Sequence, residues 1–186
     1  TLEALHHSSF QVAAIITTTG FTNVDYNLWP AFSKTILFIL MFIGACAGST
    51  GGGIKVSRIM ILFKTIKKEI AHFIHPRSIK IIKFNDKKVE HETLRSINVY
   101  LITLFILFSI SLLLISLDGH DLETNFSAVT STLNNIGPGV GGVGPTSNYG
   151  FFSGFSKFVF IINMLLGRLE IFPILLLFSP STWSKS

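Results

Sequence analysis

Two short stretches centred on glycine, TTGFT at residues 18–22 and NIGPG at residues 135–139, could bind a cation through backbone carbonyl oxygens. Each follows a segment that predicts a short helix, whose C-terminal carbonyls carry about half a negative charge. A chain that leaves such a helix end in an extended path can turn its carbonyl oxygens toward one axis and replace the water shell of a cation. Stripping an ion without replacement costs on the order of 20 kcal/mol. Gly20 and Gly137 suit this chemistry because alternating carbonyl directions need dihedrals that a Cβ would forbid.

A third stretch, GSTGGG at residues 48–53, interrupts an apolar run between residues 35–47 and the segment IKVSRIMILFK. Irregular backbone at membrane depth is tolerated only where protein or a watery cavity satisfies its polar groups. A second long apolar run, residues 158–178, contains Arg168. A lone arginine at mid-depth costs from about 3 to over 10 kcal/mol. We therefore expect Arg168 to have partners, for which the carbonyls of the glycine loop (residues 48–53) are suitable, and a fixed positive charge beside a cation path is an electrostatic barrier.

Other readings of these motifs fit the sequence less well. GSTGGGIK departs from a phosphate-binding loop because Ile54 separates the last glycine from Lys55, and an apolar helix precedes it. GVGGVG at residues 139–144 has the spacing of a dinucleotide fingerprint, but no strand precedes it and no helix follows, so we expect an extracellular turn.

His6 and His7 point about 100° apart on a helix and lack a metal-binding cluster, which favours packing or pore-mouth roles. No catalytic triad, carboxylate pair or cysteine nucleophile stands in a suitable context, so we expect no enzyme.

The composition is typical of a membrane protein. Of the 186 residues, 48% are hydrophobic and 13% charged, with a mean hydropathy of +0.57, whereas soluble domains carry about 25% charged residues. The single cysteine, Cys46, excludes an internal disulfide. The net charge is +5, and nine of the 15 Lys and Arg residues fall between residues 64 and 95. This distribution predicts a cytoplasmic loop and disfavours a nucleic-acid patch, because long apolar runs flank the basic segment on both sides.

The clearest predicted element is a transmembrane helix at residues 98–117. It has 20 residues without a charge, which at about 1.5 Å per residue spans a ~30 Å hydrocarbon core. Residues 3–17 and 123–134 predict helices that are too short to cross and suit re-entrant positions. Pro76 breaks any continuous helix through the basic connector at residues 67–93.

The two ends of the chain resemble each other. When FSK at residues 32–34 is placed over FSK at residues 155–157, an offset of 123, six of 13 positions are identical and Gly44 meets Gly167. The central glycines of the two turns stand at an offset of 117. The order of short helix, glycine turn, FSK and broken spanning helix therefore occurs twice, which indicates duplication of one membrane module.

The two turns are degenerate versions of the potassium-channel sequence TVGYG. Together with AGSTGGGIK and LGRLE, they resemble the Trk/Ktr/HKT superfamily of potassium transporters, most closely its TrkH/TrkG branch. The resemblance covers essentially the whole chain and implies an all-α polytopic membrane protein of tandem helix–pore-loop–helix repeats, with re-entrant pore helices and broken second helices. It implies potassium uptake across the bacterial inner (plasma) membrane, with the first two repeats and the first helix of the third lying outside this chain.

The resemblance also assigns site residues and divisions of the chain. The carbonyls that bind potassium in the filter would belong to Thr18, Thr19, Gly20, Phe21, Asn135, Ile136, Gly137 and Pro138. The gate would consist of Gly48, Ser49, Thr50, Gly51, Gly52, Gly53 and Arg168. The implied divisions are the third repeat (1–66), the cytoplasmic basic connector (67–93), the fourth repeat (94–180) and a cytoplasmic tail (181–186).

Partners follow from the same resemblance. It implies a homodimer and a cytoplasmic nucleotide-binding regulatory subunit of the RCK type (TrkA-like), for which the basic connector offers a docking face, as it does for anionic membrane lipid. We expect no bound cofactor, no metal other than potassium at the filter carbonyls, and no nucleic acid. Two alternatives stay open: a sodium-selective or sodium–potassium coupled (symport) member of the same superfamily, because the first filter strand lies outside the chain, and a membrane subunit that conducts nothing.

Overall fold

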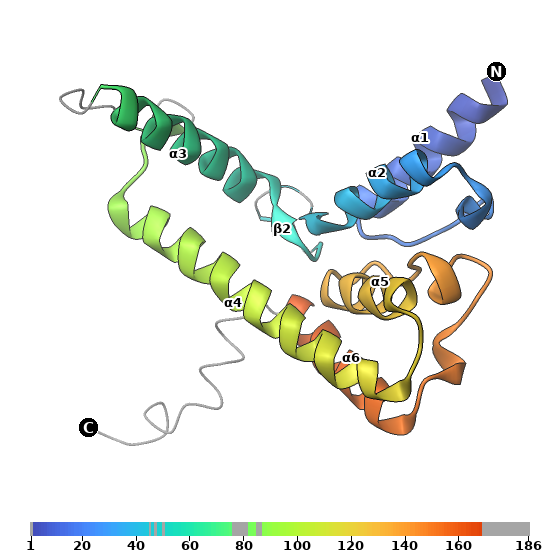
Figure 1. Cartoon of the computed structure of the whole chain (residues 1–186). Helices are drawn as coiled ribbons and strands as arrows, with labels where there is room; N and C mark the ends of the chain where they lie inside the picture. The colour runs from blue at the N-terminus through green and yellow to red at the C-terminus, as the bar shows by residue number, and fades with distance from the viewer. Residues whose placement is uncertain are drawn as a thin grey trace.

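The structure is a computed structural model that describes residues 2–44, 46, 48, 49, 51–75, 82–84 and 87–168, with only the backbone of residue 87. Within these residues the chain is mostly helical (Figure 1). The α-helices are α1 (Leu2–Ile16), α2 (Ala31–Phe42), α3 (Val56–Ile74), α4 (His91–Ile115), α5 (Leu122–Leu133) and α6 (Gly154–Arg168). The 3₁₀ helices are η1 (Tyr26–Leu28), η2 (Ser116–Asp118), η3 (Gly141–Val143) and η4 (Tyr149–Phe151). The strands are β1 (Ile43–Gly44), β2 (Ile54–Lys55), β3 (Lys83–Phe84) and β4 (Lys87–Lys88).

Helix α4 contains the predicted membrane span. With η2 it forms a 28-residue stretch, His91–Asp118, in which an 18-residue window has a mean hydropathy of 2.6. In the described part of the chain it is the one helix long and apolar enough to cross a membrane. Its outer face carries large apolar side chains, such as Phe105, which is 72% exposed, and Leu113. Because apolar surface of this kind is unfavourable in water, this face suits lipid.

Helices α1 and α5 match the two short helices predicted at residues 3–17 and 123–134. At about 1.5 Å per residue they are about 22 and 18 Å long, less than a ~30 Å hydrocarbon core. Asp121 begins α5 because its carboxylate caps the first turn and accepts a hydrogen bond from the backbone N–H of Thr124 at 2.9 Å. This hydrogen bond favours the ionised carboxylate and lowers the pKa of Asp121.

The helix that contains the glycine loop is broken, as the sequence predicts. Helix α2 ends at Phe42, and the chain resumes as α3 at Val56. Strands β1 and β2 join the two pieces by pairing in parallel, with Ile43 opposite Ile54 and the next residue of each strand in the same register. The chain therefore leaves the helix path, forms the loop and returns to nearly the same point.

Helix α3 continues beyond the predicted start of the connector at residue 67 and ends only at Ile74. Ile66, Ile70 and Phe73 follow one another at helical spacing, with lysines between them, so an amphipathic helix extends through the basic residues. The described part of the connector after α3 is an antiparallel pairing of β3 with β4. Pro76, the predicted helix breaker, lies outside the described residues.

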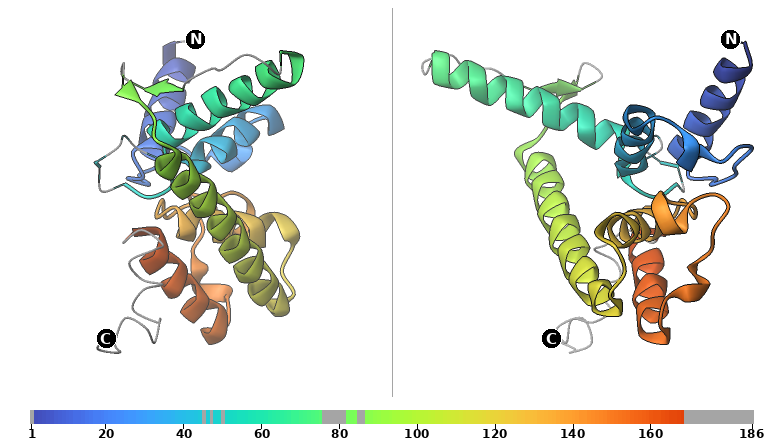
Figure 2. Two further views of the ribbon diagram at one scale, coloured as in Figure 1. Left: turned by 90° about the vertical axis from the view of Figure 1, so that its left-hand side faces the viewer. Right: turned by 45° about the vertical axis from the view of Figure 1, so that its right-hand side comes forward.

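Two clusters of buried side chains organise the helices. The first joins α4, α5 and α6 through residues such as Phe108, Val129 and Phe160. The second joins α1, η1 and α2, and it also takes in Ile136 and Val140 from the far end of the chain. Figure 2 shows the two helix groups from two further sides. The NIGPG stretch thus packs into the core of the other half of the molecule.

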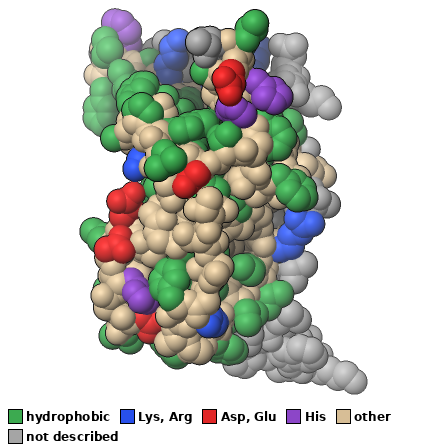
Figure 3. Space-filling model, turned by 90° about the vertical axis from the view of Figure 1, so that its right-hand side faces the viewer, with side chains coloured by type: hydrophobic (Ala, Val, Ile, Leu, Met, Phe, Trp, Pro, Cys, Tyr) green, Lys and Arg blue, Asp and Glu red, His purple; other side chains and the backbone are tan. Residues whose placement is uncertain are grey.

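The surface of the helices is largely apolar. On the face shown in Figure 3, apolar side chains lie among charged side chains, other side chains and backbone. Exposed aromatic side chains also lie on α3, as at Phe63 and Phe73, and on α6, as at Phe155 and Phe158. Apolar surface on helices of both halves indicates that lipid, rather than water, surrounds much of the molecule.

Candidate cation pathway

The two glycine stretches leave α1 and α5 through the same turn. The backbone N–H groups of Thr18 and Asn135 donate to the carbonyl three residues earlier, and the next N–H in each stretch donates to the carbonyl five residues earlier, at 3.0–3.2 Å. This arrangement is a helix-ending Schellman turn, which pairs the last carbonyls of the helix. Its left-handed residue is usually glycine, but here Thr18 and Asn135 both have a φ of 55°. Gly20 (φ 71°) and Gly137 (φ 105°) repeat the positive φ two residues later.

The two stretches touch each other although 117 residues separate them. A Cβ added to Gly20 would lie 1.9 Å from the carbonyl oxygen of Ile136 and 3.0 Å from Cδ of Pro138. Only glycine permits this approach. Because α1 and α5 both end at this contact, the partial negative charges of two helix C-termini lie near each other, which favours a cation there.

The backbone oxygens at this contact divide into two kinds. Within the described part of the chain, no hydrogen-bond donor is found for the carbonyls of Thr18, Thr19, Gly20, Phe21, Asn135 and Ile136. Backbone carbonyls inside proteins are nearly always paired, so such oxygens are available to water or to a cation. The carbonyls of the next two residues are instead held by protein: Ser131 Oγ donates to Gly137 O at 2.7 Å and to Pro138 O at 3.1 Å.

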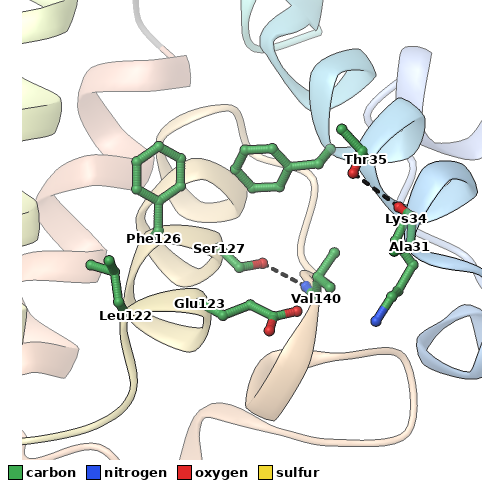
Figure 4. Close-up of a pocket in the computed structure, with 9 residues that line it drawn as sticks. Ala31, Lys34, Thr35, Leu122, Glu123, Phe126, Ser127 and Val140 are labelled. Carbon is green, nitrogen blue, oxygen red and sulfur yellow. Dashed lines mark hydrogen bonds between the residues drawn. The ribbon is translucent and has the colours of Figure 1, made fainter.

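Further hydroxyl groups fix the chain just beyond this point. Tyr149 donates from its hydroxyl to Gly137 O at 2.8 Å, and Tyr26 donates to Gly139 O at 2.7 Å. The backbone N–H of Val140 donates to Ser127 Oγ at 2.5 Å, a bond drawn in Figure 4. Side chains from both halves of the molecule therefore hold the backbone of residues 137–140 in place.

Figure 4 also shows a cavity of about 520 Å³ between α2 and α5, beside these anchors. Lys34 and Glu123 line it together with apolar side chains such as Phe126. None of the eight predicted filter residues lines this cavity. It therefore lies next to the candidate pathway rather than on it.

The glycine loop lies against the C-terminal end of α5. A Cβ added to Gly52 would lie 2.1 Å from the carbonyl oxygen of Asn134, the residue that precedes the second stretch. At the base of the loop, a Cβ on Gly44 would lie 2.2 Å from the carbonyl oxygen of Gly52. Asn134 is 1% exposed, and its Oδ1 atom has no hydrogen-bond partner among the described residues. The loop is thus packed beneath the contact between the two stretches.

Lys55 forms hydrogen bonds to this loop, a role that was not predicted from the sequence. The side chain is 9% exposed, and its Nζ donates to Ser49 O at 2.7 Å and to Gly51 O at 2.6 Å. A buried ammonium group needs such partners. The signal in the sequence was a lysine between a glycine-rich loop and an apolar helix. Lys55 binds the loop carbonyls that we expected to serve Arg168.

Arg168 is the last residue of α6 and is exposed within the described chain. The structure gives it no hydrogen bond or ion pair with the described residues. The residue before it packs closely, since a Cβ on Gly167 would lie 1.9 Å from the carbonyl oxygen of Leu133. The end of α6 and the glycine loop therefore contact neighbouring residues of the same helix end. Thr50 of the predicted gate lies outside the described residues, as do residues 169–186, which include the predicted end of the fourth repeat and the tail.

The structure adds features to the repeat seen in the sequence. Helices α2 and α6 begin 123 residues apart, and so do η1 and η4. The side chains of Asp25 and Asn148, also 123 apart, cap these 3₁₀ helices by accepting the N–H two residues later, at 3.0 and 2.7 Å. Tyr26 and Tyr149 follow them directly. The two units thus share their turns, caps and helix starts.

Metal binding by side chains has no support in the described residues, where no group of three or more His, Cys, Asp or Glu side chains could hold an ion. His7 lies 3.8 Å from Glu3 on the next helical turn and contacts Asn23 at 3.1 Å.

Two such units in a largely apolar helical chain, with carbonyls that lack donors among the described residues, are features expected of a cation transporter. The model of the TrkH family, described as a cation transport protein, matches residues 2–185. The chain belongs to this family, as the resemblance in the sequence implied.

Individual relatives agree with this assignment. The chain is 39% identical over 184 residues to the Trk system potassium uptake protein TrkH of Salmonella typhimurium, covering 99% of this chain and 38% of that protein. It is 38% identical over 179 residues to the Trk system potassium uptake protein TrkG of Escherichia coli, covering 95% of this chain and 36% of that protein. The crystal structure of the potassium transporter TrkH from Vibrio parahaemolyticus superimposes with a TM-score of 0.89 at 37% identity, covering 98% of this chain and 39% of that one. The chain thus spans less than two fifths of these relatives, which are named as transporters rather than enzymes.

Proposed function

We propose that this chain supplies two pore units of a potassium uptake protein of the bacterial inner membrane: a helix–pore-loop–helix repeat at residues 94–180 and, before it, a repeat without its first helix at residues 1–66. The observation that carries the proposal is the contact of Gly20 with Ile136 just beyond the ends of α1 and α5, in two stretches where six carbonyl oxygens have no hydrogen-bond donor among the described residues. Relatives of the chain are named as potassium uptake proteins. Further units outside this chain would complete the ring of oxygens.

In this proposal the filter acts by replacing water. A potassium ion that gives up its hydration shell needs nearly complete compensation by oxygens. Thr18–Phe21 would provide one wall, and the carbonyls of Asn135 and Ile136 would provide the next. Gly137 and Pro138 would help to position the stretch but would not bind the ion, because hydroxyl groups already donate hydrogen bonds to their carbonyl oxygens.

The glycine loop would serve as a gate below the filter. Its contact with Asn134 and the clamp of Lys55 on Ser49 and Gly51 would hold it in the path. Arg168, one residue beyond the glycine that packs on α5, would add a positive charge near the loop and repel cations. Opening would require the loop to leave Asn134.

The basic residues after the broken helix would face the cytoplasm. Lys64, in the middle of α3, donates to the carbonyl of Lys83 at 2.8 Å, so the β3–β4 pair lies against α3 and adds its lysines to those of the helix. We propose that this surface binds an RCK-type nucleotide-binding subunit or anionic lipid, and that the whole protein is a homodimer. The C-terminus would also be cytoplasmic.

Ion uptake by the full-length protein in proteoliposomes tests the proposal. We expect uptake of K⁺ in preference to Na⁺, and a reduced ratio in both Gly20→Ser and Gly137→Ser. The effect should be larger at Gly20, where a side chain meets both a positive φ and the Ile136 carbonyl, than at Gly137, where nothing lies within 4 Å. Gly154→Ser is the matched control, because Gly154 has open space and no positive φ.

Four results would contradict the proposal. Preferential Na⁺ uptake would favour a sodium-selective member of the family, and K⁺ uptake that requires Na⁺ would favour a coupled one. Absence of flux, or flux ratios unchanged in both glycine variants, would favour a subunit that does not conduct.

A further inference from the structure

Two tyrosines in equivalent places of the repeat reach the same short segment. Tyr26 and Tyr149 each begin a 3₁₀ helix, directly after its capping residue, and stand 123 residues apart. Exact repetition would give each hydroxyl a partner in an equivalent place. The structure instead directs both hydroxyls to the second stretch: Tyr149 to Gly137 O within its own unit, and Tyr26 across the molecule to Gly139 O.

The contact of Tyr26 is the better enclosed of the two. The side chain is 0% exposed and packs in the cluster that contains Ile136 and Val140, which flank the segment it holds. Its ring also meets Trp29 edge-on, with ring centres 6.4 Å apart. The hydroxyl to carbonyl distance of 2.7 Å therefore belongs to a ring held in one orientation, and a displacement of α1 and η1 would be transmitted to the segment.

We propose that Tyr26 and Tyr149 are positioning residues that set the cation preference of the second filter stretch, with Tyr26 coupling the stretch of one unit to the packing of the other. This inference rests on the proposed function. The two hydroxyls hold alternate carbonyls of the second stretch, at Gly137 and Gly139. The carbonyls of Asn135 and Ile136 lie immediately before this anchored segment, so its position fixes how closely they approach a cation.

A purely structural role for these tyrosines makes a different prediction. Buried tyrosine hydroxyls usually have a partner, and losing one alters stability whatever the segment does. Removal of the hydroxyl would then lower the melting temperature without changing the ratio of ion fluxes. A positioning role changes the ratio, because K⁺ and Na⁺ require different distances from the same oxygens. The flux ratio is therefore the decisive readout.

The experiment compares Tyr26→Phe and Tyr149→Phe in the full-length protein with Tyr100→Phe as the matched control. Phenylalanine keeps the ring and its packing, so the fold is preserved, which a melting curve of the purified protein verifies. Tyr100 lies on α4, where its ring packs under Arg58 at 4.2 Å, away from both filter stretches. Initial rates of K⁺ and Na⁺ uptake are measured in proteoliposomes for each variant.

We expect Tyr26→Phe and Tyr149→Phe to lower the K⁺/Na⁺ uptake ratio about two- to tenfold, the factor that the loss of one typical hydrogen bond produces. Tyr100→Phe should keep the wild-type ratio. A K⁺/Na⁺ uptake ratio equal to that of the wild type in both test variants would overturn the inference, and so would an equal change of the ratio in Tyr100→Phe. In either case the proposed function would stand as long as the wild-type protein takes up K⁺. A wild-type protein that takes up neither ion would overturn both.

Discussion

Replacement of Gly52 by alanine should open the glycine loop. The added methyl group would lie 2.1 Å from the carbonyl oxygen of Asn134 and 2.7 Å from its carbonyl carbon, whereas real Cβ contacts essentially never fall below 3.0 Å. One of the two partners must therefore move by about 1 Å. Asn134 resists, because its side-chain Nδ2 and its backbone N–H both donate to Thr130 O, at 2.8 and 3.1 Å. The loop is the part that should retreat.

The size of the effect follows from the cost of overpacking. Extra atoms in a well-packed interior destabilise by about 1–3 kcal/mol. If the contact of Gly52 with Asn134 exists only while the loop obstructs the path, this cost falls on the closed state alone. Each 1.4 kcal/mol is a factor of ten in a population, so the open fraction should rise about 5- to 150-fold as long as the closed state remains dominant.

Basal flux of K⁺ into proteoliposomes, without any regulatory subunit, is the assay. Gly154→Ala is the control, because it adds the same methyl group where no heavy atom lies within 4 Å. Melting curves verify that both variants are folded. Basal flux equal to wild type in a folded Gly52→Ala protein would refute the assignment of this contact to the gate, and so would a lower flux, because the methyl group would then have stabilised the closed loop.

Three further predictions concern charge, topology and stability. Arg168→Ala should raise basal K⁺ flux about tenfold or free it from regulatory control, because a cation-repelling charge is removed; unchanged flux and regulation would count against a barrier. In a Cys46→Ser background, Lys83→Cys should react with a membrane-impermeant maleimide from the cytoplasmic side only, and labelling from outside would reverse the topology. Asp121→Ala should lower the free energy of unfolding by about 1 kcal/mol at neutral pH through loss of the helix cap. Because folding lowers the pKa of Asp121, its stabilisation is complete above the unfolded pKa of about 3.9 and is lost as pH falls through the folded value; a difference between the two proteins that persists in strong acid would contradict this.

Local patterns in the sequence were sufficient to predict most of the elements. The uncharged run at residues 98–117, the short helices before the glycine turns and the break at the glycine loop depend on composition and spacing over 10 to 20 residues, and the structure contains all of them. The offsets of 117 and 123 between the units were also readable, because they involve identities and glycines. The density of lysines indicated a connector from residue 67 but not its local structure, and α3 runs through the first of these residues to Ile74 because the apolar spacing continues.

The contacts that form the site were less predictable, because they join residues distant in the chain. Thr18 and Asn135 adopt positive φ without being glycine, and a β-branched residue in that region is held there only by its surroundings. The bond from Tyr26 to Gly139 spans 113 residues and leaves no periodic signal. Lys55 is close to the loop in sequence, but its role depends on the return of the chain through β2, which residue types alone do not reveal.

The parallel pairing of β1 with β2 separates the length of the loop from the path of the helix that it interrupts. Because Ile43 lies opposite Ile54 in the parallel pairing, the end of α2 and the start of α3 lie next to each other, and the loop leaves and rejoins the helix path at that point. Residues could be added to or removed from this loop without shifting either helix along the membrane normal. The depth at which the two helices are joined therefore does not depend on the length of the loop between them.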